Sequence, residues 1–291
     1  MSRRLGRKVD RVGYWMSLPY VLHFLVFMAY PLIFAFVLVF HKWNIYTPMK
    51  WVGLGNVRFL LQDGWVWKAL FNTLYFILIH IPSQLVVALG LAQLLNRNLR
   101  GRSFFRAAYF MPVVVSGVVV TILWQQLYGQ DTGLINAALG TLGLPKVPWL
   151  TDYRLAMPSI ALMATWKNVG FYVVLFLVGL QTVPRSLYEA AELDGASGWQ
   201  QFFRITIPML NPTILLVLIL STIGGFSLFI EPYIMTGGGP AGSTLSGVLY
   251  LYKQAFFFNR MGYAATIGFF WALMILTVVV LQRKLVEQDI E

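Results

Sequence analysis

The sequence NPTILLVLILSTIGGFSLFIE occupies residues 211–231 and carries no charged side chain before its final glutamate. A helix rises about 1.5 Å per residue, so about 20 such residues cross a hydrocarbon core about 30 Å thick. Five further apolar runs of this kind are expected to span the membrane, at residues 18–40, 70–95, 105–128, 155–180 and 263–281. Backbone polar groups find no water in lipid, and the alternating pattern of a barrel is absent from the sequence, so the spans should be helices. We therefore predict an all-α, polytopic membrane protein with six transmembrane helices.

Composition supports this class and excludes several kinds of chemistry. Of the 291 residues, 58% are hydrophobic and only 11% are charged, which is typical of integral membrane proteins. The chain has no cysteine, which excludes disulfides, thiol catalysis and cysteine-ligated metals, and its three histidines show no metal-ligand spacing. We accordingly expect no catalytic residue, no metal site and no cofactor bound by this chain.

Basic residues predict the orientation. Arginines and lysines are concentrated in the N-terminal tail, in the segment 97–106 and directly after the last span, and such loops usually face the cytoplasm. We expect a cytoplasmic N-terminal tail at residues 1–17, a six-helix membrane domain at 18–281 and a cytoplasmic C-terminal tail at 282–291. The net charge of +11 is explained by this topology and by contact with anionic lipid, so no nucleic acid partner is expected.

A polar island, EAAELDGASGWQQFFRITIP, precedes the first quoted run at residues 189–208. Ser186 stands three residues before Glu189, a spacing that predicts a capping box at the start of a short helix. Gly195 stands where a helix end needs a left-handed residue, and Pro208 is expected to stop a second short helix that begins near Gly198. The predicted product is a cytoplasmic helix-turn-helix over residues 184–208. The alternative is an ordinary amphipathic loop resting on lipid.

The island resembles a known motif. Glu189-Ala190-Ala191, Gly195 and the segment Ile205-x-Ile207-Pro208 are similar to the EAA loop of permease subunits in binding-protein-dependent ABC importers, with Ile207 where leucine is commoner. Other segments resemble the sugar-importer branch, which includes permeases for maltose, lactose, glycerol phosphate and multiple sugars. They are VGLGN at 52–56, NT at 72–73, FFR at 104–106, MP at 111–112 and TGGGP at 236–240.

The resemblance implies a division of labour between subunits. This chain would be half of the translocation path in a bacterial or archaeal plasma membrane, with both termini cytoplasmic. Its partners would be a second permease, two ATPase subunits that bind ATP and Mg, an extracytoplasmic solute-binding protein and a sugar. The chain itself lacks the Gly-x-x-x-x-Gly-Lys-Ser/Thr phosphate loop, as expected of a permease. The residues that the motif assigns to ATPase coupling are Glu189, Ala190, Ala191, Asp194, Gly195, Ile205 and Pro208.

Charged and polar residues inside the spans are candidates for the substrate path, since charges there are costly. Lys167 would face a sugar or serve a snorkelling or salt-bridged structural role, and Glu231 would meet ligand or be a simple interfacial carboxylate. Small residues such as Gly225 would leave space for substrate or allow close helix packing. The full set of pathway candidates is Gln84, Trp166, Lys167, Asn168, Gly225, Ser227, Phe229 and Glu231.

Two other classes of function compete with the importer. A secondary transporter or channel would be expected to carry intramembrane carboxylates or an internal repeat, whereas these spans are nearly free of charge. An intramembrane enzyme needs a converging set of Asp, His, Glu or Ser side chains, and the sequence shows none. The sequence leaves the transported sugar open, because selectivity in this family belongs largely to the binding protein.

Overall fold

The computed structural model describes residues 2–96 and 101–286. Its regular secondary structure is helical apart from one pair of two-residue strands. The predicted all-α fold is confirmed. Within the described residues five helices are long and apolar enough to cross a membrane, and a sixth span is added if one bent helix pair counts as a single span. The chain divides into two units, one of residues 1–63 and 251–270 and the other of residues 64–250 and 271–291.

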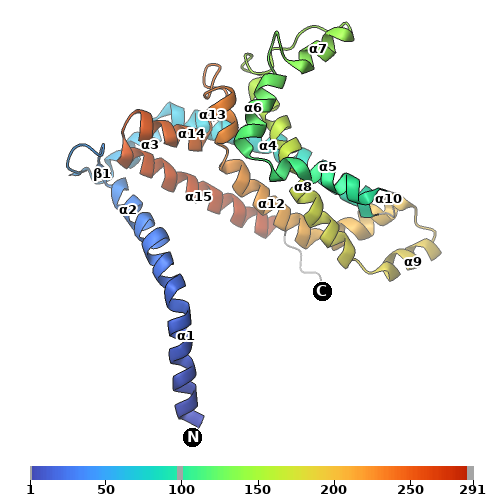
Figure 1. Ribbon diagram of the computed structural model, residues 1–291, viewed down its shortest axis with the longest axis horizontal. Coiled ribbons are helices and arrows are strands. Elements are labelled where there is room, and N and C mark those ends of the chain that lie inside the picture. Colours follow the sequence, from blue (N-terminus) through green and yellow to red (C-terminus); the bar gives the residue numbers. More distant parts are fainter. Residues whose placement is uncertain (1, 97–100, 287–291) are drawn as a thin grey trace. The chain divides into compact units, whose positions relative to one another are not determined.

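The first unit contains the first span and a small hairpin (Figure 1). The first span, Gly13–Val39, lies in a continuous helical run of α1 (Ser2–Phe24), the π-helical segment η1 (Leu25–Ala29) and α2 (Tyr30–Val39). Strands β1 (His41–Lys42) and β2 (Lys50–Trp51) then pair antiparallel, and α3 (Gly55–Gln62) follows. The unit is completed by the end of α14 (Gly247–Tyr252), the π-helical segment η3 (Lys253–Phe257) and the first part of α15 (Met261–Val286).

Close backbone contacts tie the hairpin to the helices of this unit. The Asn56 side-chain amide donates to the carbonyls of Val39 and His41 at 2.8 and 3.0 Å. A Cβ built at Gly262 would lie 1.8 Å from the His41 carbonyl oxygen, so only glycine permits this approach of α15 to β1.

The second unit is built on two long helices, α4 (Gly64–Asn96) and α8 (Ala156–Thr182), which pack against each other (Figure 1). Small residues such as Ala88, Ala92 and Ala161 are fully buried here and let the two helices approach closely. The remaining elements of the unit are α5 (Arg102–Val114), α6 (Gly117–Leu127), α7 (Leu134–Thr141), α9 (Arg185–Leu193), α10 (Gly198–Gln201), the π-helical segment η2 (Phe202–Thr206), α11 (Ile207–Met209), α12 (Asn211–Phe226), α13 (Ile230–Met235), the start of α14 and the end of α15.

Two expected spans differ from continuous helices. The run predicted at residues 105–128 is divided into α5 and α6, which meet at an angle of 106°. Pro112 removes a backbone donor near the end of α5, and Val115 and Ser116 then adopt extended backbone angles. The run predicted at 211–231 ends its first helix at Phe226 and resumes at Ile230 as α13, so that the backbone is not helical at residues 227–229.

Candidate functional site

The polar island forms the predicted helix-turn-helix, but its first helix begins differently. Helix α9 starts at Arg185 after Pro184, which has an extended backbone and makes no side-chain cap. The predicted Ser186–Glu189 capping box is therefore wrong, because Ser186 lies inside the first turn and not at the cap position. A capping box is present one helix later. Ser197 and Gln200 exchange side-chain and backbone hydrogen bonds of 2.7 and 3.4 Å at the start of α10.

Gly195 closes the turn between the two helices as predicted. Its φ of +76° is in the left-handed region that glycine adopts without a Cβ penalty. The Gly195 amide donates to the Glu192 carbonyl at 3.0 Å and the Ala196 amide donates to the Ala191 carbonyl at 2.8 Å. These two bonds make a Schellman motif, which satisfies the carbonyls at the end of α9 and sets the direction of the chain beyond it.

We call the helix-turn-helix of residues 184–208 the elbow. The prediction that its second arm ends at Pro208 is wrong, because the helix continues past this residue. Helix α10 continues through the π-helical segment η2 into α11, so the chain is helical through Met209. The π-turn bonds the Ile207 amide to the Phe202 carbonyl, five residues back, and Pro208 follows at the start of α11. Proline is tolerated in a first helical turn, and the wider turn before it accommodates the ring.

A side-chain hydrogen bond joins the two arms. The hydroxyls of Tyr188 on α9 and Thr206 in η2 lie 2.8 Å apart, and Thr206 is fully buried. Sequence reasoning missed this pair. The signal available was a tyrosine next to Glu189 and a threonine inside the Ile205-x-Ile207-Pro208 segment.

Removing this bond should loosen the elbow. We expect Tyr188→Phe to cost about 1 kcal/mol, which corresponds to about a fivefold loss of any function that needs a rigid elbow. Thermal unfolding of the detergent-purified variants measures this loss. Because Thr206→Val breaks the same bond, the double variant should be no worse than either single variant, whereas additive losses would show that the two hydroxyls act separately.

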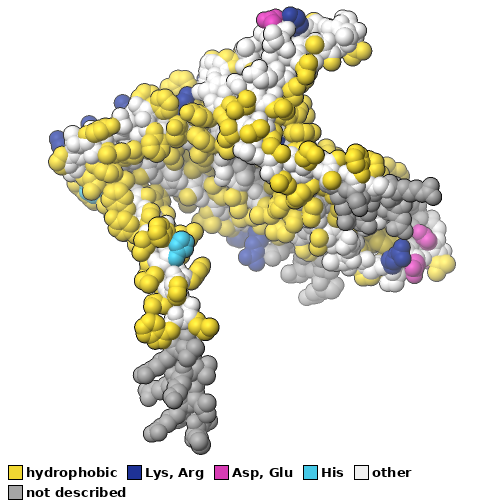
Figure 2. Space-filling view, viewed as in Figure 1, with side chains coloured by type: hydrophobic (Ala, Val, Ile, Leu, Met, Phe, Trp, Pro, Cys, Tyr) yellow, Lys and Arg dark blue, Asp and Glu magenta, His cyan; other side chains and the backbone are white. Residues whose placement is uncertain are grey.

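The elbow presents an exposed mixed surface. Of the residues assigned to coupling, Glu189, Ala190, Asp194, Gly195 and Pro208 are exposed, and Ala191 and Ile205 are half-buried. Large apolar side chains adjoin them, with Leu193 91% and Trp199 74% exposed. Acidic and basic side chains gather at the α9 end of this unit (Figure 2). An exposed apolar surface with a charged rim is typical of a protein interaction site.

A cavity of about 260 Å³ lies between α4, α8, α12 and α13 of the same unit. Four of the predicted pathway residues line it, namely Asn168, Ser227, Phe229 and Glu231. The last three are in or next to the break between α12 and α13, where the chain gives up helical hydrogen bonds. Non-helical backbone at membrane depth is tolerated where it lines a cavity or is buried in protein.

Glu231, which lines this cavity, forms an ion pair with Lys167. Lys167 Nζ and Glu231 Oε1 lie 3.0 Å apart, and their side chains are 15% and 11% exposed. A Cβ built at Gly117 would lie 2.9 Å from the same ammonium, so the start of α6 also packs against the pair. Lys167 therefore has the salt-bridge partner that its structural role requires, and its place in the substrate path stays a prediction.

Three further predicted pathway residues are, like Lys167, not among the residues that line this cavity. Gln84 is fully buried and donates to the Ser221 hydroxyl at 2.7 Å, a bond between α4 and α12. The Trp166 ring packs against Trp124 with centroids 5.3 Å apart. A Cβ built at Gly225 would lie 2.6 Å from Ile77 Cγ1, so this glycine serves close helix packing.

Gly224 and Gly225 offer a matched test of that packing. We expect Gly225→Ala to overpack the α4–α12 contact and cost about 1 to 3 kcal/mol. Gly224→Ala should leave stability unchanged, because nothing lies within 4 Å of its Cβ position. Thermal unfolding of the detergent-purified variants measures both, and an equal loss in the two would contradict the packing role of Gly225.

Sequence reasoning missed aromatic and histidine side chains that complete the cavity. Phe76, His80 and Tyr172 line it, and His80 Nδ1 lies 2.8 Å from the Thr165 hydroxyl. The Phe76 and His80 rings stack with centroids 4.9 Å apart. The available signal was spacing, since Phe76, His80 and Gln84 recur every four residues on one face of α4.

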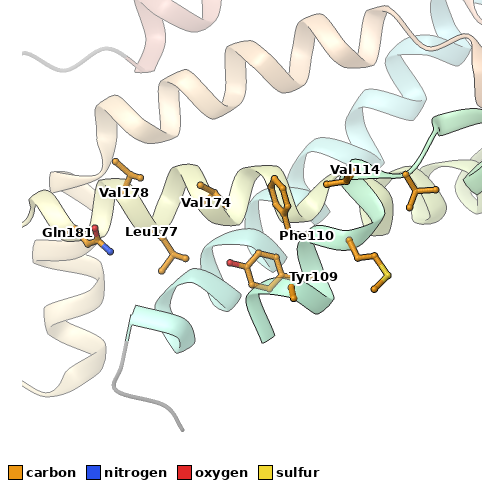
Figure 3. Close-up of a pocket in the computed structure, with 10 residues that line it drawn as sticks. Tyr109, Phe110, Val114, Val174, Leu177, Val178 and Gln181 are labelled. Carbon is orange, nitrogen blue, oxygen red and sulfur yellow. The ribbon is translucent and has the colours of Figure 1, made fainter. Parts of the chain in front are cut away.

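A larger and more apolar groove of about 880 Å³ lies between α5 and α8. Figure 3 shows Tyr109, Phe110 and Val114 of α5 near Val174, Leu177 and Val178 of α8, with Gln181 at one end. This groove has few polar groups, so it fits an apolar occupant better than a sugar.

A comparison with known protein families shows to which family the chain belongs. A family described as "Binding-protein-dependent transport system inner membrane component" matches residues 64–288. The chain belongs to this family. The permease is thus a multi-pass inner-membrane component of a binding-protein-dependent transport system, and it is not itself an enzyme.

Relatives of this permease match it along most of its length. The lactose transport system permease protein LacF of Rhizobium radiobacter is 38% identical over 96% of this chain and 95% of its own. The arabinooligosaccharides permease AraP of Bacillus subtilis is 37% identical over 94% and 87%. The trehalose/maltose permease MalF of Thermococcus litoralis is 35% identical over 84% of each chain. The predicted similarity to sugar-type permeases is confirmed.

Solved structures agree with the fold of the permease. A chain of a bacterial ABC transporter that imports the acidic polysaccharide alginate superposes with a TM-score of 0.82, at 25% identity over 99% of this chain and 100% of that chain. A structure of a bacterial alginate transporter in complex with an alginate pentasaccharide-bound periplasmic protein gives 0.80, at 26% identity over 95% and 94%.

Proposed function

We propose that this permease forms one half of the translocation pathway of an ATP-driven carbohydrate importer, and that residues 184–208 couple it to a separate ATPase subunit. The sugar class is supported by the names of relatives that transport lactose, arabinooligosaccharides and trehalose or maltose. The imported alginate of the similar transporter is also a carbohydrate. Because these relatives differ in the sugar they carry, the proposal extends to the carbohydrate class and not to one sugar.

The observation that carries the proposal is the braced elbow. A Schellman turn at Gly195, a capping box at Ser197 and the Tyr188–Thr206 bond give this short segment three independent restraints. A rigid element is what a coupling device needs, because only a stiff lever converts contacts with a partner into a shift of the membrane helices. A loop that merely rested on lipid would not need these restraints.

The elbow leads directly to the cavity. Its second arm passes through Pro208 and Leu210 into α12, and α12 ends at the non-helical segment beside Glu231. A displacement of the elbow is therefore transmitted along one helix of 16 residues to the cavity wall. In this proposal Asn168 and Ser227 bond sugar hydroxyls while Phe229 and Tyr172 offer aromatic faces, as is usual in carbohydrate pockets.

The exposed surfaces of the permease indicate where the other subunits of the importer would bind. The apolar groove between α5 and α8 fits a helix of a second, similar permease that would enclose the path. The exposed elbow fits one of two ATPase subunits, which would hold ATP and Mg. Both termini would then lie in the cytoplasm with the elbow, and the solute-binding protein would approach the opposite face.

Affinity capture tests the proposal. The permease is extracted gently from its native membranes, and proteins that co-purify in stoichiometric amount are identified. Recovery of an ATPase and a second permease is expected. A lone chain or a homo-oligomer that is stable in several mild detergents would overturn the importer assignment in favour of a secondary transporter.

A further inference from the structure

A cavity of about 560 Å³ lies within the first unit, where the first span ends at Val39 and the last span begins at Met261. Two segments far apart in sequence form it, the hairpin with α3 and the turn before α15. The Met261 amide donates to the Trp43 carbonyl at 2.9 Å and joins the two segments. Because both spans end here, the cavity lies at the boundary between hydrocarbon and water.

Three basic residues line this cavity, Lys42, Lys50 and Arg260. Lys42 and Lys50 are directly opposite each other in the β1–β2 pair. Opposite residues of an antiparallel pair lie on the same face with Cβ atoms about 4.5 to 5.5 Å apart, and like charges there are destabilising. An anion bound between the two lysines would offset their repulsion and so stabilise this two-residue pair of strands.

No acidic side chain is among the described residues that line the cavity. The ion pairs Lys146–Asp131 and Lys167–Glu231 do not involve these three cations. Arg260 lies over the Phe258 ring at 6.0 Å from its centroid, a contact that orients the guanidinium without neutralising it. The positive charge of the cavity is therefore available to a ligand.

Two residues at this place have left-handed backbone. Ile45 in the hairpin loop has φ of +70° and Asn259, which lines the cavity, has φ of +52°. A β-branched residue in this region is strained. Such strain is concentrated at binding sites, where the surrounding structure holds it in place.

Three exposed phenylalanines precede Arg260 in the chain, and one of them, Phe258, lines the cavity. Phe256, Phe257 and Phe258 are 62%, 61% and 58% exposed. Lys and Arg side chains are visible near β1 in Figure 2 among hydrophobic side chains. Cations beside exposed aromatic rings match a ligand that has an anionic head and an apolar tail.

We propose that this cavity binds the phosphodiester headgroup of an anionic phospholipid, with the phosphate between Lys42, Lys50 and Arg260 and an acyl chain along Phe256–Phe258. Trp43, Asn44 and Tyr263 are among the other residues that line the cavity, and they would surround the glycerol backbone. Such a lipid would offset the repulsion between the two lysines and hold the ends of the first and last spans together.

Native mass spectrometry of the purified full-length permease tests the site, with lipid supplied as nanodiscs of phosphatidylglycerol and phosphatidylcholine. The wild-type protein should retain phosphatidylglycerol, and the Lys42→Gln/Lys50→Gln variant should retain it about 30-fold less, at about 1 kcal/mol for each basic residue near an anionic surface. Arg58→Gln is the matched control. It removes one positive charge from α3 of the same unit without lining the cavity, and it should leave retention unchanged.

Further measurements distinguish binding of the lipid from binding of other anions. Water-soluble dioctanoyl phosphatidylglycerol should raise the melting temperature of the wild-type protein, and inorganic phosphate at the same concentration should not. Lys42→Arg/Lys50→Arg should retain the lipid, which shows that the loss in the glutamine variant is a loss of charge and not of folding. Equal stabilisation by phosphate, or unchanged retention in the glutamine variant, would overturn the proposal.

Discussion

Gly195→Val is expected to reduce uptake by the assembled transporter about 30-fold while the permease remains inserted in the membrane. Gly195 has φ of +76°, and a β-branched residue pays about 2 kcal/mol to adopt it. The Schellman bonds of Gly195 and Ala196 would then be lost or strained, and the two arms of the elbow would no longer meet the proposed ATPase partner at the same angle. Uptake in cells and ATPase co-purification both measure the effect.

Two variants isolate the backbone conformation as the cause. Gly195→Asn should retain most of the activity, because asparagine tolerates the left-handed region. Gly198→Ala adds a Cβ to a neighbouring glycine of ordinary φ, where nothing lies within 4 Å, and should be neutral. Undiminished uptake in Gly195→Val would contradict the role of the turn, and an equal loss in Gly198→Ala would show that any bulk on the elbow is harmful.

Glu231→Gln is the second large expected effect. It leaves the Lys167 ammonium without its partner 3.0 Å away in a site where the side chain is 15% exposed. Removing one member of a buried ion pair costs about 3 to 5 kcal/mol, because the remaining charge is desolvated and uncompensated. We expect a clear drop in the melting temperature of the purified permease and a loss of uptake.

The double variant Lys167→Met/Glu231→Gln separates stability from transport. Replacing both partners should recover most of the stability, since a neutral pair leaves no buried charge. If uptake also recovers, the ion pair serves the fold alone; if uptake stays low, Glu231 acts on the path. The exposed pair Lys146–Asp131 is the control. Its side chains are 58% and 81% exposed, so Lys146→Gln should cost about 0.5 kcal/mol or less.

The turn of the elbow follows from local signals in the sequence. The spacing of the acidic helix, Gly195 and Pro208 predicts a helix-turn-helix, because a left-handed residue and a proline act on the backbone wherever they occur. The helix ends are harder to predict. The cap expected at Ser186 is wrong since Pro184 begins the helix earlier, and the π-turn before Pro208 has no sequence signature.

For the candidate substrate path too, the sequence identifies residue types and only the structure shows their contacts. The sequence identifies Lys167 and Glu231 as the costly charges of the spans, since charge in lipid needs compensation wherever it is placed. Their pairing across 64 residues depends on how α8 and α13 come together. Gln84 and Gly225 are candidates for the path by residue type, yet the packing of α4 on α12 assigns one to a hydrogen bond with Ser221 and the other to contact with Ile77.

The sequence alone therefore determined the membrane class, the approximate positions of the spans, the elbow turn and the family, because hydrophobic length, glycine conformation and motif spacing are properties of contiguous residues. The tertiary structure decided the 106° break after Val114, the Tyr188–Thr206 brace, the cavity beside the α12–α13 break and the opposed lysines at the end of the first span. Each of these depends on contacts between residues that are distant in sequence or on a choice between competing backbone conformations, and only packing in three dimensions selects among them.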